Sequence, residues 1–92
     1  NSGIDNQKKN DKIKCWTENG RICIEGSDFY RGKEFRLQIT DLSGRVIGME
    51  DCIVDSYRLL SETILSMPGA YFIQVIDKET DVTVLQIRCI AN

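Results

Sequence analysis

This chain of 92 residues contains no histidine, a single proline and no long uninterrupted apolar segment. Without histidine it lacks both the usual cysteine–histidine zinc sites and the base that normally activates a catalytic cysteine. Its carboxylates are scattered over expected turns and do not suggest an acid/base pair around a cleft. Apolar runs of a few residues are too short for the helix of about 20 residues that crosses a bilayer. We therefore expect no enzyme activity, no metal or other cofactor, and no membrane insertion.

An excess of charge is also missing, because 12 basic and 14 acidic residues leave a net charge of −2. This balance gives no general attraction for nucleic acid, so we expect no nucleic-acid partner. A chain of this length builds one core. Residues 1–12 are polar apart from Ile4, which predicts a flexible N-terminal arm or linker before a single domain over residues 13–92.

The pair Asn19-Gly20 separates two alternating segments, residues 12–18 and 21–25. Asn-Gly in this setting is the strongest short-range signal for a two-residue type I′ hairpin, whose turn residues take positive φ. Opposed residues in the resulting register share a face of the sheet. Cys15 is then turned toward the core, and Trp16 toward the outer face.

Further strand signals follow along the chain. Residues 34–41 alternate as a half-buried antiparallel strand does, and the next turn can reverse the chain if Gly44 takes positive φ. A return strand is expected over residues 46–49. A second corner at Gly69 leads directly into an apolar strand, and the last strand is expected over residues 82–90.

Residues 51–65 allow two interpretations. Four apolar residues fall at the spacing of an amphipathic helix: Ile53, Tyr57, Leu60 and Ile64. The alternative uses strands over residues 57–60 and 63–65, and we prefer it because strand pairs lie on both sides at short spacing. The prediction is an all-β fold, an immunoglobulin-like antiparallel β-sandwich of about seven strands.

The order of these elements resembles a known family, the C-terminal sorting domains of the Bacteroidetes type IX secretion system. The elements that carry the resemblance are an early strand pair, a strand ending in Asp, a Gly-Arg turn, a Gly-x-Tyr corner and a last strand. They are residues 22–25, residues 35–41, Gly44-Arg45, Gly69-Ala70-Tyr71 and residues 82–90. Small secreted Ig-like proteins of gut Bacteroidetes look similar too.

This resemblance implies an Ig-like module that is read by an outer-membrane translocon. Its location would be secreted or at the cell surface, with the periplasm crossed in transit. The chain departs from the family at its end, because such domains often finish with a basic residue and this one finishes Cys89-Ile90-Ala91-Asn92. The expected function is protein sorting or protein–protein interaction without enzyme activity.

Exposed aromatic residues suggest a rival function, a carbohydrate-binding or adhesive module. Trp16 on the outer face could stack on a sugar ring or a partner side chain unless a neighbouring segment covers it. Phe29, Tyr30 and Arg31 could form a binding tip, or their rings could plug the open end of the sandwich. The expected partner is thus a protein or translocon, with a glycan as the alternative.

The four cysteines contain no Cys-x-x-Cys pair, which leaves disulfides or buried free thiols. Cys23 is expected on the outer face of the first hairpin. Cys15 and Cys89 are expected to face inward on the first and last strands, which Ig-like sandwiches often bring together. They are therefore the most favourable pair for a disulfide, although two buried thiols would fit the core equally well.

Overall fold

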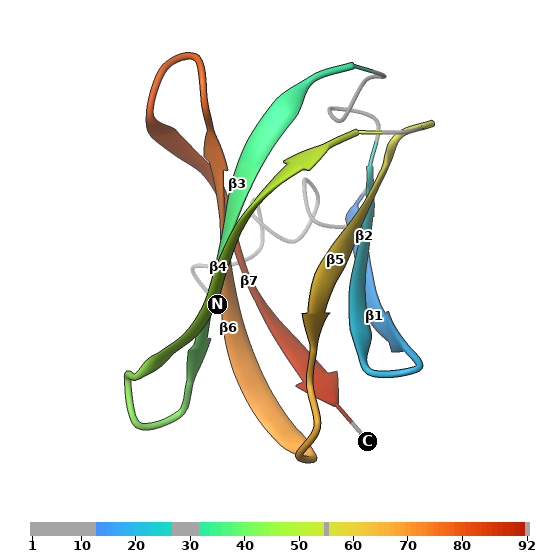
Figure 1. Cartoon of the computed structure of the whole chain (residues 1–92), viewed down its shortest axis with the longest axis vertical. Coiled ribbons are helices and arrows are strands. Elements are labelled where there is room, and N and C mark those ends of the chain that lie inside the picture. Colours follow the sequence, from blue (N-terminus) through green and yellow to red (C-terminus); the bar gives the residue numbers. More distant parts are fainter. Residues whose placement is uncertain (1–12, 27–31, 55, 92) are drawn as a thin grey trace, which may run out of the picture.

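The computed structural model describes residues 13–26, 32–54 and 56–91. Within them, seven antiparallel strands form two sheets packed face to face (Figure 1). The strands are β1 (Ile13–Glu18), β2 (Arg21–Gly26), β3 (Glu34–Asp41), β4 (Val46–Ile53), β5 (Arg58–Ile64), β6 (Gly69–Asp77) and β7 (Val82–Ala91). The three-stranded sheet has the order β1-β2-β5, and the four-stranded sheet has the order β4-β3-β6-β7. The prediction of an all-β sandwich is confirmed.

The strand order and one corner resemble those of immunoglobulin-like sandwiches. The chain crosses between the sheets three times, from β2 to β3, from β4 to β5 and from β5 to β6. Tyr71 lies buried near the start of β6, and its hydroxyl donates a hydrogen bond of 2.7 Å to the carbonyl oxygen of Met67. The contact resembles the tyrosine corner of Ig-like domains, in which the ring packs in the core and the hydroxyl ties the preceding loop to the strand.

The first hairpin has the predicted turn and register. Asn19 and Gly20 have φ values of 54° and 81°, as a type I′ turn requires. Cys15 pairs with Ile24 and Trp16 with Cys23, and Cys15 packs against the core. Cys23 lies on the outer face of this hairpin, as expected, and it is nevertheless fully buried. Its neighbours on the adjacent strands are large, Trp16 on β1 and Leu60 on β5.

The described part of residues 51–65 contains the end of β4 and all of β5 and no helix, so the helical alternative is wrong. β4 continues to Ile53, four residues beyond the predicted end at Met49, because the alternation of buried and exposed side chains persists. β5 is one strand whose pairing with β2 is irregular between Arg21 and Cys23. The four apolar residues at helical spacing do not form one buried stripe, since Ile53, Tyr57 and Ile64 are more than half exposed and Leu60 is 37% exposed.

Two glycines have the backbone conformation that the turns require. Gly44 has φ of 91° and Gly69 has φ of 139°. The turn before β4 is organised by Asp41, whose Oδ1 accepts hydrogen bonds from the Ser43 amide, the Ser43 hydroxyl and the Arg45 amide. The Ser43 hydroxyl and these amides lower the pKa of Asp41.

The core lies between the sheets and contains aliphatic side chains from both. Its fully buried large members are Ile22, Ile24, Leu37, Ile39, Leu59, Ile73, Val54 and Val75. No helix in the described residues is long and apolar enough to cross a bilayer.

Candidate functional site

Trp16, the strongest sequence candidate, is partly covered. It lies on the outer face of the three-stranded sheet, as predicted. The guanidinium carbon of Arg58, on β5, is 5.8 Å from the centre of the indole ring. Arg58 also forms an ion pair of 3.3 Å with Glu25. This cation–π contact occupies one face of the ring that a sugar would use.

The other sequence candidates divide into three groups. Phe29, Tyr30 and Arg31 lie outside the described residues. The turn glycines occupy corners of the fold. Cys15 and Cys89 are neighbours, as expected, and their thiols interact across the two sheets. This interaction lowers the pKa of Cys89 and raises that of Cys15, and burial raises the pKa of Cys15 further. All four cysteines are free thiols.

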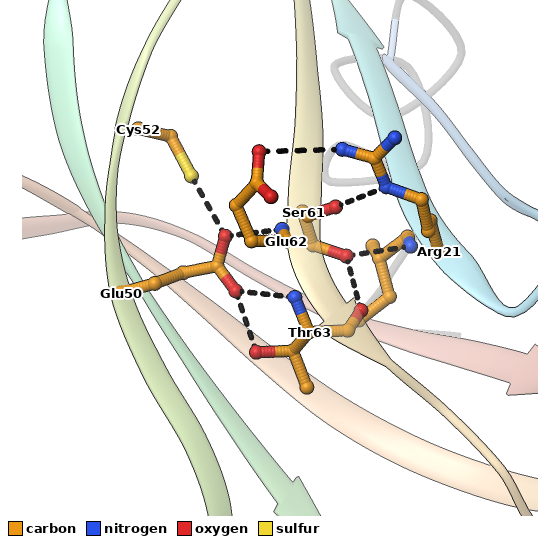
Figure 2. A network of polar contacts seen from close by, with 7 residues as sticks. Arg21, Glu50, Cys52, Ser61, Glu62 and Thr63 are labelled. Carbon is orange, nitrogen blue, oxygen red and sulfur yellow. Dashed lines mark hydrogen bonds and ion pairs between the residues drawn. The ribbon is translucent and has the colours of Figure 1, made fainter.

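A carboxylate between the sheet edges is the most extensively bonded polar group of the described structure (Figure 2). Glu50 on β4 reaches β5, where its Oε2 accepts hydrogen bonds from the Thr63 amide at 2.9 Å and the Thr63 hydroxyl at 2.6 Å. Its Oε1 accepts from the Glu62 amide at 2.6 Å and from the thiol of Cys52 at 3.4 Å. Gly48 permits this close approach, because a Cβ there would lie 3.0 Å from the Thr63 hydroxyl oxygen.

The bonding of Glu50 indicates a structural role. Burial opposes its ionisation, but the Thr63 hydroxyl and the two amides outweigh burial and lower its pKa. Both oxygens are occupied by protein donors, so neither is available to take a proton from a substrate. On the far side of β5, the Ser61 hydroxyl accepts from the Ile22 amide and donates to the Thr63 carbonyl. The two side chains complete backbone hydrogen bonding where β5 departs from regular pairing.

The outer face of the four-stranded sheet is the candidate site. For the four-stranded sheet, "outer face" without further qualification means the side of β4-β3-β6-β7 that points away from the core. Register places Gln38, Gln74 and Gln86 side by side on β3, β6 and β7, and places Thr40, Phe72 and Arg88 in the next row. A shallow groove runs over these two rows. Three neutral amides and a phenyl ring therefore lie together in one concave region.

Large apolar side chains surround this groove. Phe72 is 46% exposed, Met49 on β4 is 56% exposed, and Ile90 on β7 is 51% exposed. An antiparallel sheet that faces only water normally presents polar residues on that side. The outer face breaks this pattern on three of its four strands.

Charged residues lie beyond one end of the groove. Asp51 on β4 forms ion pairs with Arg36 at 3.2 Å and with Lys78 at 2.8 Å. Lys78 and Arg36 lower the pKa of Asp51. The described residues contain no cluster of histidine, cysteine or carboxylate ligands that could hold a metal ion. The groove thus combines neutral amides and a phenyl ring with one cation, Arg88, and favours apolar and hydrogen-bonding contacts.

The outer face was not among the sites predicted from the sequence. The signal in the sequence was the presence of apolar residues at strand positions where a water-facing side normally has polar ones, as at Phe72 in β6 and Ile90 in β7. A comparison of the chain with protein-family models, curated proteins and solved structures finds no match.

Proposed function

We propose that this protein is a non-enzymatic Ig-like module that binds a protein partner through the outer face of its four-stranded sheet. The observation that carries the proposal is the set of half-exposed apolar side chains around the groove, with Phe72 at its centre. Contiguous apolar surface rimmed by polar groups is typical of protein interfaces, and aromatic residues and Met are enriched at interface centres.

The glutamines of the groove suit the same role. Each amide can donate and accept hydrogen bonds, so Gln38, Gln74 and Gln86 can pair with the backbone or side chains of a partner. The charges of Arg36, Asp51 and Lys78 are paired with one another at one end. These three charges can therefore stay paired when a partner covers the face, whereas Arg88, which lines the groove, needs an acidic group of the partner.

The resemblance to type IX sorting domains supplies the setting of this proposal. The resemblance implies that the partner is an outer-membrane translocon and that the protein is secreted or lies at the cell surface. Two observations agree with it: the fold is Ig-like, and Asp41, Gly44-Arg45 and the Tyr71 corner occupy structural turns. The test is to attach the full chain to a reporter in a strain with the translocon and in a strain without it. Surface display only in the first strain is expected, and display in both would remove the sorting role.

The protein partner can be sought by photo-crosslinking. A benzoyl-phenylalanine at position 72 should cross-link a second protein, which mass spectrometry identifies. The matched control is position 57, since Tyr57 is also aromatic, is 52% exposed and precedes β5 of the other sheet. Titration of the identified protein should show at least about a tenfold loss of affinity for Phe72→Ala. Equal cross-linking from both positions, or unchanged affinity, would contradict the outer face as the site.

A carbohydrate-binding module is the second candidate, because Phe72 beside three glutamines and Thr40 also offers stacking and hydrogen bonds to sugar hydroxyls. A glycan array distinguishes the two. Selective binding that is lost in Phe72→Ala or in Trp16→Ala would replace the protein-binding proposal. An array without signal is the expected outcome.

A further inference from the structure

One edge strand of the four-stranded sheet begins with an uncharged segment. The described strands place β7 at the end of the order β4-β3-β6-β7, next to β6 alone. Its first six residues, Val82–Ile87, are Val-Thr-Val-Leu-Gln-Ile, without a charge, a proline or a glycine. Val82 and Val84 are about half exposed. Exposed edges of this composition readily pair with another strand, and natural proteins usually prevent such pairing with charges, especially Lys.

The other described edges carry such protection. β4, at the opposite end of the same sheet, contains the acidic pair Glu50-Asp51. β1 carries Lys14 and Glu18. At β5, the amides of Glu62 and Thr63 already donate to Glu50. Among the described strands, β7 is therefore the edge most suited to accept a new strand.

The C-terminal half of β7 is adjacent to another part of the fold. Cys89 contacts Cys15 of β1, where the edges of the two sheets meet. The pairing of β7 with β6 is irregular at Val84, because Leu85 pairs with Val75 and Thr83 pairs with Ile76. The uncharged half of β7 is thus the half that lies away from the Cys15–Cys89 contact.

Opposite charges stand at the two ends of this segment. Asp81 precedes it and Arg88 follows it. Neither side chain forms an ion pair with another described residue. If two such segments pair in antiparallel fashion about a two-fold axis, Asp81 of each copy approaches Arg88 of the other. The segment is therefore complementary to itself in charge as well as in composition.

We propose that two copies of this chain associate through antiparallel pairing of Val82–Ile87 of β7, which joins two four-stranded sheets into one of eight strands. Backbone hydrogen bonds between the edges provide the pairing. Val82, Val84 and their counterparts supply apolar cross-strand contacts, and the two Asp81–Arg88 pairs set the register. A second copy of the chain matches this edge, because the two uncharged segments then lie side by side and each Asp81 meets an Arg88 and not another carboxylate.

The proposal is tested by sedimentation equilibrium of the full chain over a hundredfold range of concentration. The wild type should show a monomer–dimer equilibrium. Val84→Lys should weaken it at least about tenfold. Val46→Lys is the matched control, because Val46 is 48% exposed on β4 at the opposite edge of the sheet. A wild type that stays monomeric, or equal loss of dimer in both variants, would overturn the proposal.

A charge exchange tests the register. Arg88→Asp should weaken the dimer because it places two carboxylates together, and adding Asp81→Lys should restore it. Circular dichroism of each variant verifies folding, since Asp81 has φ of 61° and Lys is less favourable there. No recovery in a folded double variant would overturn this pairing. Phe72→Asp separates it from the proposed function, because loss of the dimer in this variant alone would assign self-association to the outer face.

Discussion

Replacing Glu50 by glutamine removes the charge between the sheet edges while keeping the shape of the side chain. The amide oxygen can still accept from Thr63, but the NH2 group then faces the Glu62 amide, a donor. Hydrogen bonds to a charged group contribute about 1.5–3 kcal/mol and neutral ones about 0.5–1.5. The stabilisation from each of the two part-buried hydrogen bonds donated by Thr63 falls by about 1 kcal/mol, whereas the exposed Glu62 amide can donate to water instead. We expect unfolding free energy to fall by about 2 kcal/mol, and Tm by roughly 8–16 °C.

The assay is urea unfolding at several pH values, with Glu62→Gln as the control. The Glu62 side chain is 87% exposed and 3.4 Å from Arg21, so its loss should change stability by less than about 0.5 kcal/mol. The pKa of Glu50 is lower in the folded state than in the unfolded state. Its contribution is therefore complete above about pH 4.3 and is lost as pH falls through the folded pKa. The difference between wild type and Glu50→Gln should shrink on acidification. A difference that grows, or that equals the Glu62→Gln control at pH 7, would refute the reasoning.

Three further predictions concern the corners and the thiol pair. Gly44→Ala and Gly69→Ala should each lower the unfolding free energy by about 1 kcal/mol, because both glycines have positive φ; chemical denaturation measures it, and unchanged stability would remove the turn assignment. Tyr71→Phe should cost about 1 kcal/mol by losing the bond to the loop carbonyl, and an unaltered Tm would contradict this role. We propose that Cys15 and Cys89 can form a disulfide, each losing a proton and an electron to glutathione disulfide, which becomes two thiols. Intact mass should fall by two hydrogen atoms, and Cys15→Ala should not show this loss; an unbridged wild type would contradict it.

The local features of the fold could be read directly from the sequence. Asn19-Gly20 forms the predicted hairpin because a type I′ turn depends on two adjacent residues with positive φ. The resulting register places Cys15 inward and Trp16 outward, as expected. The end of β4 was harder to predict, because exposed Met49 and Ile53 weaken the polar half of its alternation.

The candidate site was less predictable. Trp16 was identified by type and face, but Arg58, which covers its ring, comes from β5 and is distant in the sequence. Phe72 looked like an ordinary member of an apolar strand. Its place beside three glutamines depends on which strands become neighbours in the sheet.

The sequence by itself determined the seven-strand pattern, the turns at Gly20, Gly44 and Gly69, and the inward direction of Cys89. These properties follow from the two-residue period of a strand and from local backbone sterics. Only the tertiary structure decided that Glu50 meets Thr63 and that β7 pairs with no described strand other than β6. Such relations depend on strand order and on how two sheets pack, because side chains distant in the chain become neighbours only when the core closes.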